Sequence, residues 1–268
     1  MFYNAKNNYL KIGDKSVNYI SFGKGEKNLI IIPGLGDGFK TTKGLAIPFS
    51  IMYKMFSNDF KVYVFSRKNE MIDDYNTEDM ANDLKIMLDK IGISKASVVG
   101  VSQGGMIAQY LAINNPKLIE KLVLVVTLSK QNEIVNKRIN KWINLAKENN
   151  YKEIFIDTCE NSYTEHTLKK YRKMYKLLTK ISKPKTLDRF IVEAKACLTH
   201  NAYEKLKNID CPTLIIGGSK DNIVGVNASK EIHKKIKNSE LYIYDDYGHG
   251  LYEEAKDFNK RVYDFLIR

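Results

Sequence analysis

The sequence predicts an α/β protein with an open, mostly parallel sheet that helices cover on both faces. Short runs rich in β-branched residues alternate with segments of helical periodicity, the pattern of βαβ units. Runs such as Leu29–Ile32 are apolar at every position, and such strands belong in a sheet whose two faces are both buried. A chain of 268 residues can bury a sizeable core without disulfides.

The strands are predicted from these runs in chain order. Two early segments, Tyr9–Ile12 and Val17–Phe22, have no helix between them, so we expect a hairpin at one edge of the sheet. The runs predicted as central strands are Leu29–Pro33, Lys61–Ser66, Ser97–Gly100, Lys121–Val126, Thr213–Gly217 and Leu241–Tyr244.

The alternation of strands and helices stops between Leu128 and Tyr203, where four helical stretches follow one another. We interpret residues 128–203 as an inserted helical cap, and residues 1–127 and 204–268 as the core. We expect Trp142, the only tryptophan, to pack the cap rather than contact a substrate. The insertion holds 16 Lys or Arg against 8 Asp or Glu, so it carries +8 of the chain's net charge of +12.

Composition excludes several classes of protein. With 44% hydrophobic and 28% charged residues, the chain is neither disordered nor fibrous. The longest apolar run, Leu122–Val126, is far shorter than the roughly 20 residues that a membrane span needs. Met1–Lys6 shows no secretory signal, so we expect a cytoplasmic protein. A disulfide framework and a metal site are not expected, because the only cysteines are far apart and in no CxxC spacing: Cys159, Cys197 and Cys211.

The most informative motif is G-x-S-x-G, in Gly100-Val101-Ser102-Gln103-Gly104. A strand-like run precedes it and a helical run follows it. A sharp strand-to-helix turn of this composition holds its serine in a strained conformation, with the hydroxyl exposed above the sheet. Larger residues than glycine at positions 100 and 104 would collide as the chain folds back. Ser102 is therefore the predicted nucleophile.

A serine hydroxyl needs a base and an orienting carboxylate. Among the histidines, His249 alone lies in a loop directly after the last predicted strand, at the carboxyl edge of the sheet. Asp221 follows the strand before that one, whereas the first acid after Lys121–Val126 is the more distant Glu133. The other histidines are poorer candidates: His166 and His200 fall in the cap and His233 in a polar helical segment.

The chain order Ser102, Asp221, His249 resembles that of the α/β-hydrolase superfamily, and the resemblance covers nearly the whole chain. It implies an α/β-hydrolase fold, and the insertion after the sixth strand resembles the usual cap. Acyl transfer also needs backbone donors for an oxyanion, and the expected ones are the N–H groups of Gln103 and Leu35. Many members carry His-Gly where this chain has Pro33-Gly34, but the donor is main chain, so the oxyanion hole is still expected.

These residues predict a serine hydrolase that cleaves an ester, thioester or lactone of a small or acyl substrate through an acyl-enzyme, with no cofactor. Haloalkane dehalogenases and epoxide hydrolases of this fold use aspartate at the elbow, so Ser102 argues against both. Three alternatives stay open: a C–C bond hydrolase, a cofactor-free haloperoxidase-type activity, and a slow-turnover ligand sensor that signals through the cap.

The expected partner is a small ester-like molecule. The positive charge of the cap suggests that the substrate is attached to an anionic acyl carrier, such as coenzyme A or an acyl carrier protein. Nucleic acid is not an expected partner, because no recognised binding module accompanies the basic charge.

Overall fold

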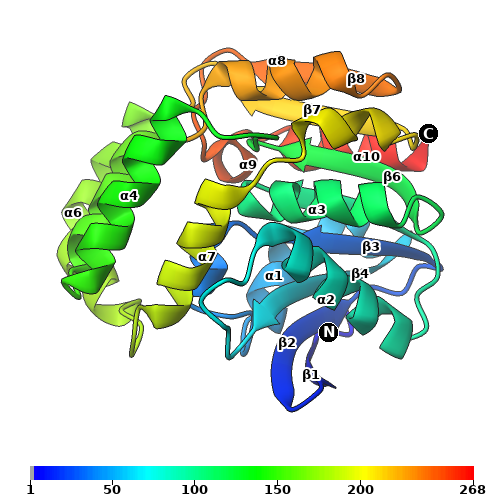
Figure 1. Ribbon diagram of the computed structural model, residues 1–268, viewed down its shortest axis with the longest axis horizontal. Coiled ribbons are helices and arrows are strands. Elements are labelled where there is room, and N and C mark those ends of the chain that lie inside the picture. Colours follow the sequence, from blue (N-terminus) through cyan, green and yellow to red (C-terminus); the bar gives the residue numbers. More distant parts are fainter. Residues whose placement is uncertain (1–2) are drawn as a thin grey trace.

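The computed structural model describes residues 3–268. Met1 and Phe2, where the predicted core begins, lie outside the described residues. Eight strands form one sheet in the order β1-β2-β4-β3-β5-β6-β7-β8 (Figure 1). Strand β2 is antiparallel to both of its neighbours, and all the other pairs are parallel. The strands are β1 (Lys6–Ile12), β2 (Lys15–Phe22), β3 (Lys27–Ile32), β4 (Phe60–Lys68), β5 (Ala96–Val101), β6 (Ile119–Val125), β7 (Thr213–Gly218) and β8 (Ser239–Tyr244).

Helices cover both faces of this sheet. Helices α2, α3 and α8 pack on one face, and α1, α9 and α10 pack on the other (Figure 1). The α-helices are α1 (Ala46–Met52), α2 (Thr77–Lys90), α3 (Gln103–Asn114), α4 (Glu133–Lys147), α5 (Tyr151–Ser162), α6 (Glu165–Ile181), α7 (Asp188–Thr199), α8 (Val226–Lys235), α9 (Leu251–Glu254) and α10 (Phe258–Ile267), with 3₁₀ turns η1 (Leu35–Gly38), η2 (Lys54–Phe56) and η3 (Tyr203–Asn208). The predicted three-layer α/β fold is confirmed.

Strand β3 shows why the sheet needs two covered faces. Ile30 and Ile32 belong to the core beneath α2 and α3, whereas Leu29 and Ile31 belong to the core on the opposite face. Successive side chains of a strand point to opposite faces, so an unbroken apolar run places apolar groups on both.

The predicted hairpin is present, and each predicted strand is found with ends that differ by a few residues. Strand β1 begins at Lys6 rather than Tyr9, because Lys6, Asn7 and Asn8 pair with β2 although they are polar. Polar residues are tolerated there because β1 is an edge strand and its outer positions meet solvent. Hydrophobic pattern alone therefore underestimates its length.

Four helices, α4 to α7, lie between β6 and β7 in the chain, in the region where the sequence predicts a cap. We call residues 128–203 the cap segment. Figure 1 shows it at the left of the sheet, beyond the end of β6. In α6, Leu168 and Tyr175 are buried against α5, while the lysines on the other side of the helix are exposed. The apolar and basic side chains of α6 therefore lie on separate faces of this helix.

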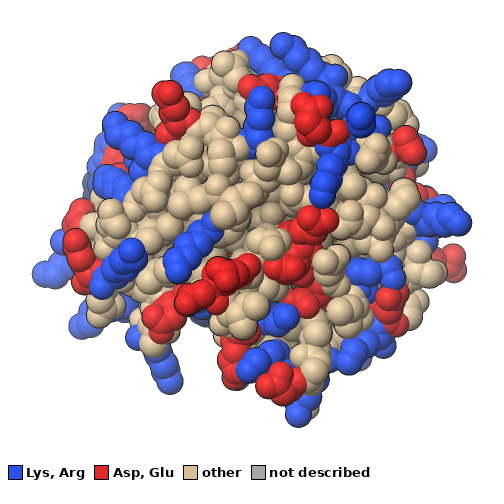
Figure 2. All heavy atoms as spheres, viewed as in Figure 1, with Lys and Arg blue, Asp and Glu red and all other residues tan. Residues whose placement is uncertain are grey.

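Charge is spread over the molecular surface. Figure 2 shows Lys and Arg side chains over the cap segment at the left and over the region of α8 at the top, with acidic groups between them. Within residues 3–268, no helix combines the length and apolar character that crossing a bilayer would demand.

The tight contact between Gly104, at the start of α3, and Ile32, at the end of β3, provides a test of how α3 packs on the sheet. A Cβ added at Gly104 would lie 2.0 Å from the Ile32 carbonyl oxygen, whereas one added at Gly36 would meet nothing within 4 Å. We expect Gly104→Ala to lower the free energy of unfolding by about 2 kcal/mol or more, because backbone atoms cannot yield as a flexible side chain does. Gly36→Ala, the control, is expected to change it by less than about 0.5 kcal/mol. Urea unfolding of the two variants measures the difference, and equal stability would contradict the packing described.

Candidate active site

Ser102 lies at the turn between β5 and α3, where the sequence predicts it. Its φ of 53° and ψ of −120° are unusual for a residue with a side chain. A Cβ on Gly100 would lie 2.5 Å from the Gly104 carbonyl oxygen, so the chain closes on itself too tightly for larger residues. The turn leaves Ser102 half-buried, with its side chain at the wall of a pocket.

His249 and Asp221 come from two other loops at the same edge of the sheet. The Ser102 Oγ lies 3.0 Å from His249 Nε2, and His249 Nδ1 lies 2.9 Å from Asp221 Oδ2. His249 is in the loop between β8 and α9, and Asp221 follows β7. The three predicted residues therefore form a continuous hydrogen-bonded series.

Asp221 is held as an ionised acceptor. Burial by itself would raise its pKa, but the charge and hydrogen bond of His249 and two backbone hydrogen bonds outweigh burial, so the pKa is lowered. Those backbone donors are the N–H groups of Ile223 and Val224, which donate to Oδ1 at 2.8 and 2.9 Å. Oδ2 is left to accept from His249, which sets the imidazole so that Nε2 faces the serine.

The other histidines lie elsewhere. His200 is buried with Nδ1 2.9 Å from the Thr77 hydroxyl, and desolvation lowers its pKa to about 3, so it stays neutral. His166 is exposed at the start of α6, and His233 contacts the Ser239 hydroxyl. Of the four, the structure brings only His249 to Ser102.

The two residues predicted as oxyanion donors flank the serine. Gln103 is the first residue of α3, and Leu35 is the first residue of η1. Among the described residues, no backbone or side-chain acceptor is bonded to either N–H. The loop before η1 passes close by, because a Cβ on Gly34 would lie 3.2 Å from Ser102 Cβ and 3.7 Å from its Oγ. Within the described residues both N–H groups thus lack an acceptor, and their role as oxyanion donors stays a prediction.

A cavity of about 350 Å³ opens above Ser102 and His249. Most of its lining is apolar and comes from both the core and the cap segment. Trp142 is buried and its Nε1 donates to Asp157 at 2.7 Å, so it packs the cap segment as predicted. It also lines the cavity, and the expectation that it does not contact a substrate stays a prediction.

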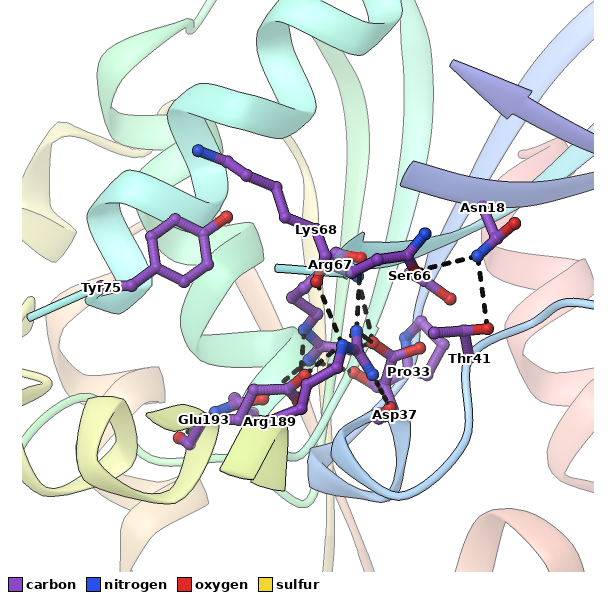
Figure 3. Close-up of polar contacts among 12 residues, drawn as sticks. Asn18, Pro33, Asp37, Thr41, Ser66, Arg67, Lys68, Tyr75, Arg189 and Glu193 are labelled. Atoms are coloured by element: carbon purple, nitrogen blue, oxygen red, sulfur yellow. Dashed lines mark hydrogen bonds and ion pairs between the residues drawn. The ribbon is translucent and has the colours of Figure 1, made fainter. Parts of the chain in front are cut away.

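The sequence did not predict a cluster of four charged residues that lies beside the loop between β3 and η1 (Figure 3). Arg67 is the last but one residue of β4, Asp37 lies in η1, and Arg189 and Glu193 project from successive turns of α7. Arg189 pairs with Asp37 and lies 3.2 Å from the Glu193 carboxylate, which is also 3.9 Å from Arg67 Nε. Of these four residues, only Arg67 carried a signal in the sequence, because it comes directly after a predicted strand and therefore lies at the carboxyl edge of the sheet.

Arg67 connects the loop before Leu35 with the start of α3. Its Nη2 donates to the Pro33 carbonyl oxygen at 2.6 Å and to Gln103 Oε1 at 3.0 Å. The Gln103 side chain in turn donates to the Glu193 carbonyl oxygen at 2.6 Å. Because these groups are buried, the contacts fix the loop before Leu35 relative to the start of α3.

Glu193 makes the cluster sensitive to pH. Desolvation raises its pKa to about 8 from an ordinary 4.5, although Arg67 and Arg189 oppose the shift. The folded protein therefore keeps a proton that the unfolded chain loses, so stability falls as the pH rises from about 4.5 to about 8.

We expect Glu193→Gln to remove this dependence. Relative to the variant, the wild type should lose at least about 1.4 kcal/mol of unfolding free energy between pH 5 and pH 8.5, the equivalent of one pKa unit. Urea unfolding at the two pH values measures this, with exposed Glu148→Gln as the control that follows the wild type. Parallel curves for all three proteins would show that Glu193 does not titrate in this range.

Comparison with known proteins agrees with the geometry. The model of the alpha/beta hydrolase fold family matches residues 27–256. A Pseudomonas putida protein described as 2-hydroxy-6-oxononadienedioate/2-hydroxy-6-oxononatrienedioate hydrolase 2 is 25% identical, over 94% of this chain and 92% of its own length. The Bacillus subtilis AB hydrolase superfamily protein YisY is 28% identical, over 71% of this chain and 74% of its own.

Solved structures resemble the chain over nearly its full length. MGS-M2, an alpha/beta hydrolase from a Medee basin deep-sea metagenome library, superposes with a TM-score of 0.86 at 25% identity, covering 97% of this chain and 98% of its own. The enol-lactonase from Burkholderia xenovorans LB400 shares the fold, with a TM-score of 0.82 at 18% identity, covering 97% and 100%. The matched family model spans most of the sequence, so the chain belongs to the alpha/beta hydrolase fold family and is a hydrolase.

Proposed function

We propose that this protein is a serine hydrolase that cleaves an ester, thioester or lactone through an acyl-enzyme on Ser102. The observation that carries the proposal is the unbroken series from Ser102 Oγ through His249 to Asp221, with 3.0 and 2.9 Å separations, at the wall of an apolar cavity. A serine, a base and an orienting carboxylate in this arrangement generate a nucleophile at neutral pH.

In the proposed reaction, His249 Nε2 takes the Ser102 proton as Oγ attacks the substrate carbonyl. Asp221 stabilises the imidazolium and remains ionised, because its pKa is lowered. His249 then gives the proton to the leaving group, and a water activated by the same nitrogen hydrolyses the acyl-enzyme.

The negative oxygen of the tetrahedral intermediate is assigned to the N–H groups of Leu35 and Gln103. The Gln103 N–H also lies at the N-terminus of α3, where the helix dipole favours negative charge. Arg67 acts as a positioning residue, because it bonds to both segments without lining the cavity. Fixed donors of this kind cost little reorganisation during the reaction.

The relatives favour a second candidate, hydrolysis of a carbon–carbon bond. The names of several of them specify a dioate, which carries two carboxylates. Among the described residues that line the cavity, Lys40 is the only Lys or Arg, and it is exposed. An apolar cavity with so little positive charge suits a neutral acyl group better than a dicarboxylate. Haloperoxidase-type activity uses the same three residues and remains an alternative.

The anionic acyl carrier also remains a proposal. The exposed lysines of α6 lie on the outside of the cap segment, where Lys173, Lys176 and Lys180 take part in no ion pair with a described residue. A carrier would therefore contact that outer face rather than the cavity, and its attraction would weaken with added salt.

Ser102→Ala tests the proposed nucleophile. We expect fluorophosphonate to label the wild type and not the variant, and kcat/KM for p-nitrophenyl esters to fall at least about 10³-fold, because the attacking atom is lost. An unchanged melting temperature serves as the control for folding. Turnover above about 1 s⁻¹ would favour an enzyme, whereas slow single turnover with a ligand-dependent change in the cap segment would favour the sensor. Labelling that survives in Ser102→Ala would place the nucleophile elsewhere.

A direct competition separates the two hydrolytic candidates. We expect kcat/KM for p-nitrophenyl butyrate to exceed that for a 2-hydroxy-6-oxo-dienedioate by at least about tenfold, because the cavity offers the second substrate little charge compensation. Chromatographic analysis of the products from both substrates measures the ratio. A preference for the dioate would make carbon–carbon hydrolysis the function.

A further inference from the structure

One carboxylate in the cavity has no role in the proposed mechanism. Glu253 lies on α9, four residues after His249, and lines the same cavity. Among residues 3–268, no Lys, Arg or His lies within ion-pair distance of its carboxylate. Its bonded partner is the Tyr163 hydroxyl, which donates to Oε2 at 2.6 Å.

Aromatic residues surround this carboxylate. Tyr163, Tyr53 and Tyr252 all line the cavity, and the Tyr252 hydroxyl also interacts with Glu253. Desolvation, with the negative charge of Glu253 as a further cause, raises the pKa of all three phenols. They therefore remain neutral, and Glu253 is the carboxyl group at this part of the cavity.

The electrostatics of Glu253 are those of a carboxylate without a counterion. Residue 253 is exposed and lines both the cavity and a second surface pocket, yet desolvation raises the pKa of its carboxylate in spite of the hydrogen bond from the Tyr163 hydroxyl. The nearby charge of Glu254 raises the pKa further. A bound cation would relieve both effects.

Glu254 provides a contrast within the same helix. Its carboxylate accepts from the Thr164 hydroxyl at 2.6 Å and from the Thr164 backbone N–H, so it ties α9 to the start of α6. It does not line the cavity. Both carboxylates thus bond to the segment before α6, Glu253 through Tyr163 and Glu254 through Thr164, but of the two only Glu253 lines the cavity.

We propose that Glu253, together with Tyr53, Tyr163 and Tyr252, binds a positively charged nitrogen of the substrate, an ammonium or quaternary ammonium group. The inference rests on the proposed function and specifies its substrate class. A carboxylate supplies charge attraction, and tyrosine rings attract cations through their π systems. The remainder of the cavity is apolar, which suits an uncharged acyl group beside Ser102.

A pair of substrates of equal shape tests this site. Butyrylcholine carries a trimethylammonium group, and 3,3-dimethylbutyl butyrate replaces its nitrogen by carbon. We expect the wild type to prefer the choline ester by about tenfold in kcat/KM, and Glu253→Gln to reduce the preference to about twofold or less while it retains activity on the neutral ester. Glu254→Gln is the matched control and should keep the tenfold preference.

Binding to Ser102→Ala, measured by calorimetry, gives a readout that does not need turnover. The variant should bind butyrylcholine more tightly than its isostere, and adding Glu253→Gln should abolish the difference. Cleavage of neutral esters with no preference for the cation in either assay would overturn this inference and leave the proposed function standing. Binding that favours the cation with no cleavage of any ester would support the site and overturn the proposed function. The wild-type comparison decides the matter even if Glu253→Gln fails to fold.

Discussion

The close contact between the start of α3 and the end of β3 is the constraint on which the rest of the site depends. Gly104 approaches the Ile32 carbonyl so closely that no side chain fits between them. This approach requires the chain to reverse within one residue after β5, and Ser102 takes the positive φ that the reversal demands. The strain is compensated by the packing of α3 on the sheet, and it leaves the Ser102 hydroxyl beside the cavity rather than in the core.

The same contact positions the other parts of the candidate site. Because α3 begins beside the end of β3, the Gln103 N–H and the loop before Leu35 lie near one another. The carboxyl ends of β7 and β8 meet this edge as well, and the loops that follow them carry Asp221 and His249. Residues more than 100 positions apart in the chain thereby come within hydrogen-bond distance.

Charge is arranged differently behind the cavity and at its wall. Behind it, Arg67 and Arg189 face Asp37 and Glu193, and because Glu193 keeps its proton up to about pH 8, Asp37 carries the negative charge of this cluster at neutral pH. At the cavity wall, Glu253 accepts a hydrogen bond from the Tyr163 hydroxyl and lies near the charge of Glu254, with no basic group of the described residues within ion-pair distance. A buried charge without a full set of partners is costly, which is why Glu193 keeps its proton, whereas Glu253 lies at the wall of a cavity that a ligand can enter.

The fold and the nucleophile follow from local sequence. Apolar runs fixed the strands, and Gly100, Ser102 and Gly104 specified the turn, because each imposes a steric requirement that no distant residue can change. His249 and Asp221 were predictable because parallel strands share one carboxyl edge, which makes the loop after each strand a candidate. The tertiary structure alone decided the partners of Arg67, the position of Trp142 at the cavity wall and the absence of a basic partner within ion-pair distance of Glu253 among the described residues. Those properties depend on which side chains of α7, the cap segment and α9 come together, and contacts between distant segments leave no periodic trace in the sequence.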